Sequence, residues 1–199
     1  MTSQAGWGSC KQPLLLRPPG AAAGSLYLRS EWCIVPHPEK AHRGGEDACF
    51  VSPRTLGVAD GVGGWANKGV DAGIFANALM KAARRHSTPE AASEDASPPP
   101  PLETLRAAHE HVKALKIAGS STACILSLEA KPAGAGPQQK LQAANLGDSG
   151  LVLVRAGHII HRSREQCHGF NFPFQLGSQR STDSAADAGI WEQVHTSFT

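Results

Sequence analysis

The sequence predicts an α+β fold in which amphipathic helices lie against an antiparallel sheet. Short apolar runs separated by turn residues predict hairpins at 48–59, 121–146 and 151–161, and hairpins join antiparallel strands. Between the first hairpin and the other two, the stretches 70–86 and 102–115 repeat apolar residues at helical spacing. A chain of 199 residues with 41% hydrophobic and 18% charged residues suits one globular core.

Composition excludes several classes of protein. The net charge of +2 does not favour a nucleic acid or an anionic membrane surface as partner. The five cysteines are odd in number and form no CxxC pair, which argues against a disulfide framework or a zinc ribbon and favours reduced thiols inside a cell. No apolar run approaches the roughly 20 residues that span a bilayer.

The first hairpin brings acidic residues together. Glu46 and Asp47 precede the run Ala48–Val51, and Asp60 follows the run Leu56–Ala59. Because the two strands are antiparallel, these carboxylates should lie at the same end of the sheet. Hard divalent cations bind oxygen ligands of this kind. The hairpin therefore predicts a metal site.

A glycine-rich loop follows this hairpin. Gly61, Gly63 and Gly64 allow the backbone to turn sharply, to bring a carbonyl to a metal and to leave an open mouth for a substrate. A dinucleotide-binding loop is the competing interpretation, since this loop also joins a strand to a helix. It lacks the GxGxxG spacing, however, and it follows a hairpin instead of a βαβ unit.

The two helices are separated by a linker. Residues 87–101 contain four consecutive prolines, which continue neither neighbour. His109 and His111 lie two residues apart on the second helix, so they face different directions and do not share a metal. We expect both to be ordinary surface or rim histidines.

The second half of the chain is rich in strands. Residues 131–139 form a Pro- and Gly-rich hairpin loop, and the turn 147–150 reads Gly-Asp-Ser-Gly at a sheet end. By itself this turn, with Asp148 at its centre, is an ordinary tight turn.

The N-terminus has the composition of an organelle transit peptide. The first thirty residues hold three basic residues and no acidic one, with small residues and proline filling most of the rest. A plain disordered N-terminus is the other interpretation.

Five segments, taken in order, resemble one family. GEDACFV, LGVADGVGGWANKGVDAG, GSSTACIL, LGDSG and FNFPFQL are similar to the metal-dependent type 2C protein Ser/Thr phosphatases of the PPM superfamily, and more narrowly to its mitochondrial and plastid branch. The resemblance covers about residues 43–176. It divides the chain into a transit-like or disordered N-terminus (1–40), the N-terminal part of a phosphatase domain (41–176) and a divergent tail (177–199) expected to be disordered.

The resemblance implies a four-layer αββα sandwich that is incomplete at its C-terminus, with a pair of Mn²⁺ or Mg²⁺ ions and a metal-activated water that dephosphorylates phosphoserine and phosphothreonine in proteins. On matching positions, Glu46 and Asp60 would be carboxylate ligands and Gly61 a ligand through its carbonyl. Asp47 would be an acid outside the immediate ligand set, and Asp148 would help to hold a weaker further ion. The implied partners are phosphorylated proteins in the mitochondrial matrix, with plastid or cytosol as other locations.

Three departures from the family pattern stand out. Val62 replaces a histidine that serves many members as candidate general acid. Arg43 is our choice for the phosphate-binding arginine that the family places just before the acidic pair. The two further aspartates of the family's second half are not found, and neither Asp183 nor Asp187 has their context. We therefore expect a truncated chain with weak Mn²⁺ binding and little activity; the alternative function is a non-catalytic variant that binds partners or has no function.

Overall fold

The computed structural model of the chain describes residues 26–88, 96–130, 139–178 and 182–195. Its centre is a five-stranded antiparallel sheet in the order β1-β2-β4-β5-β11. The strands of this sheet are β1 (Asp47–Val51), β2 (Thr55–Asp60), β4 (Ala123–Leu128), β5 (Gln139–Leu146) and β11 (Gly189–His195). Most of the predicted transit-like segment, the middle of the linker and residues 131–138 of the predicted hairpin loop lie outside the described residues, while Gln139, predicted as the last residue of that loop, begins β5.

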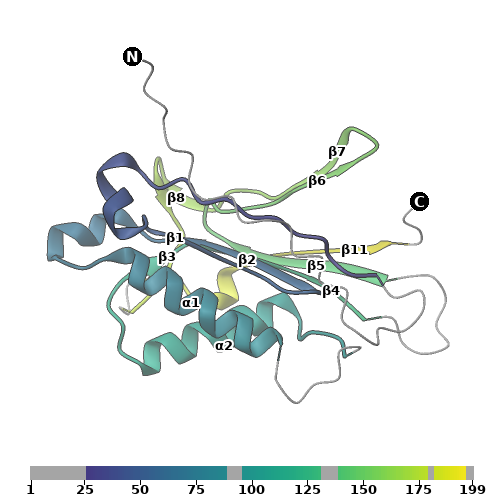
Figure 1. Cartoon of the computed structure of the whole chain (residues 1–199), viewed down its shortest axis with the longest axis horizontal. Coiled ribbons are helices and arrows are strands. Elements are labelled where there is room, and N and C mark those ends of the chain that lie inside the picture. Colours follow the sequence, from purple (N-terminus) through teal and green to yellow (C-terminus); the bar gives the residue numbers. More distant parts are fainter. Residues whose placement is uncertain (1–25, 89–95, 131–138, 179–181, 196–199) are drawn as a thin grey trace.

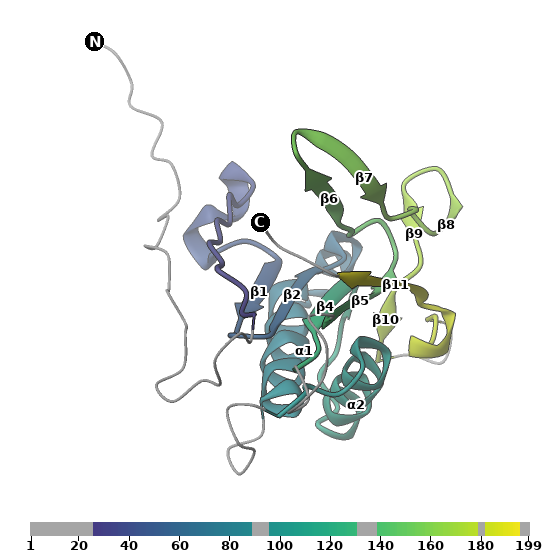
Figure 2. The same cartoon turned by 90° about the vertical axis from the view of Figure 1, so that its right-hand side faces the viewer.

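Two helices cover one face of this sheet. α1 (Ala72–Ser87) and α2 (Pro101–Ala114) lie side by side beneath it in Figure 1, and the turned view of Figure 2 shows the same arrangement. Between helices and sheet the core is fully buried and apolar, and its largest members include Phe75, Leu79, Met80, Leu105 and Ile125. Antiparallel strands with packed helices confirm the predicted α+β class.

The β1–β2 hairpin folds as the sequence predicts. Asp47 pairs with Asp60, and the register continues without a break to Val51 opposite Leu56. Gly57 is a glycine because a Cβ there would lie 2.2 Å from the Phe50 ring. This close packing fixes β2 against the core and so fixes where its last residue, Asp60, emerges.

Smaller elements occupy the other side of the sheet and its end. The hairpin β6 (Val152–Arg155) and β7 (His158–Arg162) lies across the sheet from the helices (Figures 1 and 2). β8 (Cys167–Gly169) pairs with β9 (Phe172–Pro173), and the short β3 (Ser120–Ser121) pairs with β10 (Leu176–Gly177). The described residues also form the 3₁₀ helices η1 (Pro38–Arg43), η2 (Gly63–Lys68) and η3 (Ala185–Asp187).

The predicted disorder of residues 177–199 is wrong for the described part of that segment. η3 there is closed by a capping box, in which the Ser184 and Asp187 side chains each accept a backbone N–H of the other residue. β11 then extends the central sheet along the whole of β5. Sequence alternation missed β11 because the strand is an edge that follows a turn of small residues.

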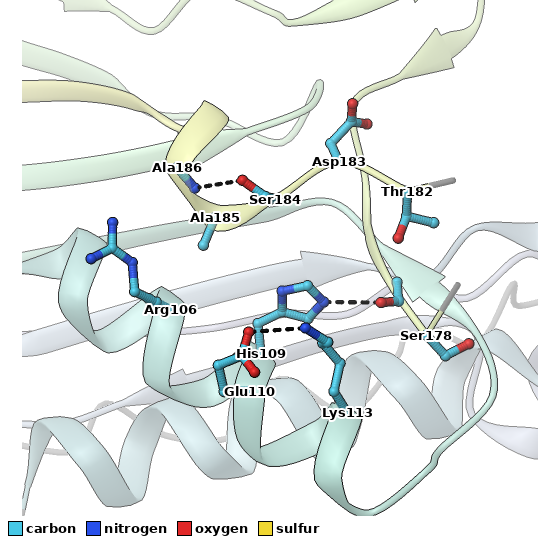
Figure 3. Close-up of a pocket in the computed structure, with 11 residues that line it drawn as sticks. Arg106, His109, Glu110, Lys113, Ser178, Thr182, Asp183, Ser184, Ala185 and Ala186 are labelled. Carbon is cyan, nitrogen blue, oxygen red and sulfur yellow. Dashed lines mark hydrogen bonds and ion pairs between the residues drawn. The ribbon is translucent and has the colours of Figure 1, made fainter. Parts of the chain in front are cut away.

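His109 is also placed differently from the prediction. It is buried, and its Nε2 lies 3.0 Å from the Gly177 carbonyl oxygen. A cavity of about 350 Å³ lies between this part of α2 and residues 177–178 and 182–186, and the ion pair between Lys113 and Glu110 borders it (Figure 3). His109 thus joins α2 to β10.

No helix in the described part of the chain is long and apolar enough to span a membrane.

Candidate metal centre

The first feature of the site is a pair of facing aspartates. Asp47 begins β1 and Asp60 ends β2, and the two are direct cross-strand partners. When Asp60 is protonated, its carboxyl group donates a hydrogen bond to the Asp47 carboxylate, which raises the pKa of Asp60 and lowers that of Asp47. The predicted convergence of these two acids at one sheet end is therefore observed.

Electrostatics show that four carboxylates meet here. Burial first, and then the nearby charges of Asp47, Asp148 and Glu46 in that order, together raise the pKa of Asp60 to about 6. Burial likewise raises the pKa of Asp47, although its hydrogen bond with Asp60 and the charge of Lys40 act in the opposite direction. Crowded like charges of this kind are relieved by a bound cation. Asp148, which the Gly-Asp-Ser-Gly turn alone did not single out, thus lies within electrostatic range of Asp60.

Glu46 faces two cations. Its side chain is only 9% exposed, and Oε2 contacts the Lys40 ammonium while Oε1 lies 3.1 Å from the Arg43 guanidinium. Arg43 also approaches Asp71, at 3.8 Å, and Asp71 caps α1 by accepting the Gly73 N–H. Arg43 therefore lies beside the acidic pair as predicted, but in this structure its partners are carboxylates.

One loop glycine, Gly61, is required by space, and a second, Gly63, is closely packed. A Cβ at Gly61 would lie 2.6 Å from the Ala72 carbonyl oxygen, and one at Gly63 would lie 3.0 Å from both Glu46 Oε2 and Lys40 Nζ. Gly61, Gly63 and Gly64 are not among the glycines with positive φ. Close packing, and not an unusual backbone angle, therefore accounts for the small residues at 61 and 63. The loop consequently packs directly on the acidic residues.

The backbone of Asp60 is held from a distant part of the sequence. Ser121 Oγ donates to the Asp60 carbonyl oxygen at 2.8 Å, and the Thr122 N–H donates to the same oxygen at 3.0 Å. Thr122 Oγ1 in turn lies 2.6 Å from Ser149 Oγ, in the turn that carries Asp148. Hydrogen bonds thus join the three motifs that the sequence presents separately.

Comparison with known proteins finds several similar protein phosphatases. The chain is 44% identical over 168 residues to the probable protein phosphatase 2C 55 of Arabidopsis thaliana, covering 83% of this chain and 33% of the relative. It is 44% identical over 141 residues to the protein phosphatase PTC7 homolog fig of Drosophila mojavensis, covering 68% and 42%. The X-ray structure of the photosystem II phosphatase PBCP matches with a TM-score of 0.66 and 33% identity, over 85% of this chain and 60% of that one.

The chain belongs to the type 2C protein phosphatases of the PPM superfamily. It spans about a third to two fifths of the length of these curated relatives. The catalytic domain of the Ser/Thr phosphatase PstP, solved with two manganese ions, shares the fold with a TM-score of 0.51 at 18% identity, over 75% of this chain and 65% of that domain. No protein-family model matches the chain.

The donor set of this type 2C phosphatase fits a hard divalent ion. All its acidic groups are carboxylates, which suit Mn²⁺ and Mg²⁺, and they crowd closely enough to shift one another's pKa. Within the described ranges, no three His, Cys, Asp or Glu side chains form a ready-made metal cage. The ligands of a bound ion would accordingly include backbone oxygen and water as well as side chains.

Sequence reasoning missed two residues near this centre. The first is Lys40, whose position six residues before a candidate ligand is the signal that could have found it. The second is His168, whose Nε2 lies 2.9 Å from an Asp183 carboxylate oxygen and whose ring stacks on Phe174. His168 lines a pocket of about 240 Å³ together with Trp65 and other residues of the glycine loop.

Proposed function

We propose that this protein hydrolyses phosphoserine and phosphothreonine esters in proteins at a Mn²⁺ or Mg²⁺ centre. Glu46 and Asp60 would hold the metal through their carboxylates and Gly61 through its carbonyl, with Asp60 between two ions. Asp47 would be an acid beside Asp60, outside the immediate ligand set, and Asp148 would help to hold a weaker further ion. The observation that carries this proposal is the convergence of these carboxylates at one sheet end in a chain 44% identical to type 2C phosphatases.

Bound divalent ions lower the pKa of a coordinated water and stabilise charge during in-line attack on phosphorus. The protein groups have separate tasks. Arg43, which already lies among the acids, would bind the phosphoryl oxygens in a bidentate manner once a metal neutralises Glu46. Val62 offers no proton, so the leaving oxygen would receive its proton from water.

The substrate would reach the centre beside the glycine loop. The pocket there combines aromatic walls from Trp65 and Phe172 with the Lys68 ammonium, which lies 4.8 Å from the centre of the Trp65 ring. These groups suit an extended peptide that carries a phosphorylated residue. The relative named PTC7 homolog and the transit-like N-terminal composition support phosphoproteins of an organelle, with the mitochondrion as our proposed location.

The test measures metal binding and hydrolysis on the same preparation. Because the proposed set here is two carboxylates and one carbonyl, we expect weak Mn²⁺ binding and slow, Mn²⁺-dependent release of phosphate from a phosphothreonine peptide, both removed by EDTA. Asp60→Asn should abolish both, while Glu110→Gln, a surface control on α2, should change neither. Hydrolysis that is indifferent to EDTA, or Mn²⁺ binding that is unchanged by Asp60→Asn, would refute the proposal.

A further inference from the structure

Lys40 reaches the acidic cluster from a rigidly held backbone. It lies within η1, which ends at Gly44 in the left-handed conformation with φ of 89°. The Lys40 N–H donates to the His37 carbonyl oxygen at 2.8 Å, and the Lys40 carbonyl oxygen accepts the Gly45 N–H at 3.1 Å. Both backbone groups are therefore occupied, and the side chain leaves the 3₁₀ helix in one direction, toward the acids.

The end of this side chain lies inside the proposed ligand set. Lys40 Nζ contacts Glu46 Oε2. It also lies 3.0 Å from the position that a Cβ on Gly63 would take. It is also close enough to Asp47 to act on that carboxylate. An ammonium in this place uses the very oxygen that Glu46 would offer to a metal ion.

We propose that Lys40 is a tethered cation that pairs with Glu46 until a divalent ion displaces it, and that this competition sets the metal affinity of the centre. The inference rests on the proposed function, because it concerns the same metal centre. It assigns to Lys40 a positioning role: the lysine holds the Glu46 carboxylate in place without contacting the substrate.

The two cations on Glu46 are suited to different tasks. A nearly buried carboxylate without a partner is costly, so the metal-free protein needs a cation beside Glu46. Arg43 binds Oε1 and approaches Asp71 as well, which anchors it at the start of α1. Lys40 is a point charge on a flexible stem, and Glu46 is the partner of its ion pair. Lys40 can therefore leave Oε2 to the metal first, while Arg43 stays on Oε1 until a phosphoryl group arrives to take its guanidinium.

The sign of the effect is fixed by electrostatics. Removing a unit positive charge about 6 Å from a divalent ion, with the screening of bulk water, strengthens binding by roughly tenfold. A lysine with only a structural role would give the opposite result, because its loss would loosen Glu46 and weaken the metal site.

The first measurement is Mn²⁺ affinity, followed by the electron paramagnetic resonance of free Mn²⁺ at pH 7.5. We expect Lys40→Met to bind Mn²⁺ about tenfold more tightly than the unmodified chain and Lys40→Arg to bind it about equally. The matched control is Lys113→Met, which breaks another Lys–Glu ion pair of 3.0 Å on α2 (Figure 3) and should leave the affinity unchanged.

The second measurement uses only the unmodified chain, so its result does not depend on whether a variant folds. Trace acetylation of the unmodified chain, quantified by peptide mass spectrometry, reports how available each lysine is. Saturating Mn²⁺ should raise the labelling of Lys40 relative to Lys113, because the displaced amine leaves its ion pair. Labelling of Lys40 that falls or stays constant would overturn the inference.

The outcomes separate the two proposals. If the unmodified chain binds Mn²⁺ in an Asp60-dependent way but Lys40→Met binds it equally or more weakly, the tethered cation is wrong and the metal centre stands. If neither the unmodified chain nor Lys40→Met binds Mn²⁺, both proposals are wrong. Tighter binding by Lys40→Met together with increased Lys40 labelling supports the inference.

Discussion

Replacing Asp60 by asparagine should stabilise the metal-free protein while removing its response to metal. The pKa of Asp60 lies at about 6 instead of its ordinary 3.8, because burial and three neighbouring carboxylates disfavour its ionised form. That displacement corresponds to about 3 kcal/mol at neutral pH. Since part of the side chain remains in contact with water, solvent screening reduces the expected gain to about 1 kcal/mol.

The pH dependence of this gain has a definite sign. A raised folded-state pKa means that the folded protein keeps the proton longer than the unfolded chain. The metal-free protein therefore loses stability as the pH rises from about 3.8 to about 6, and the loss persists above. The advantage of Asp60→Asn should be full at pH 7.5 and should vanish near pH 4.

Urea unfolding followed by circular dichroism, with and without Mn²⁺, measures both effects. In EDTA, Asp60→Asn should unfold at higher urea than the unmodified chain, and in Mn²⁺ the order should reverse, because only the unmodified chain gains stability from the ion. The surface control Glu110→Gln should show no gain at any pH. A variant that is less stable than the unmodified chain in EDTA at pH 7.5 would show that the Asp60 carboxylate is not under electrostatic strain.

Three further predictions concern the frame of the site. Burial lowers the pKa of His109 below its ordinary 6.5, so stability should fall as the pH drops below about 6.5, and His109→Gln should remove that part of the pH dependence in urea titrations at pH 7.5 and 5.5. Gly57→Ala should lower the free energy of unfolding by about 1 to 3 kcal/mol, since its methyl group overlaps the Phe50 ring; an unchanged urea midpoint would contradict this. Trp65→Phe loses the 2.6 Å hydrogen bond from the indole to Ser120, and thermal unfolding should report a cost of about 1 kcal/mol.

The sequence predicts the hairpin and the acidic pair well because both are local. The turn after Val51 and the alternation of apolar residues determine the pairing, and the pairing alone brings Asp47 opposite Asp60. Asp148 could be placed only through the family resemblance, because its approach to Asp60 depends on a sheet built from strands far apart in the chain.

Other features depend on contacts that have no local signal. β11 forms because β5 offers it an unpaired edge, and the composition of residues 189–195 does not show that edge. His109 is buried because β10 crosses α2 and presents the Gly177 carbonyl, which the helical pattern of α2 does not reveal. In each case the partner lies more than 40 residues away in the sequence, where spacing rules give no information.

Without metal, the carboxylates of the acidic centre repel one another, and contacts from the surrounding structure hold them in place. Asp60 is held by its backbone, through Ser121 and Thr122, so its position does not rely on favourable contacts of its own carboxylate. Glu46 is held through its side chain by two cations. Among the described residues, no cation has to leave the Asp60 carboxylate before it binds metal. The Glu46 carboxylate must first exchange a cationic side chain for the metal ion. Substitutions that change the charge around Glu46 should therefore alter metal affinity strongly. A substitution of Ser121 should alter it by shifting the Asp60 backbone that Ser121 holds.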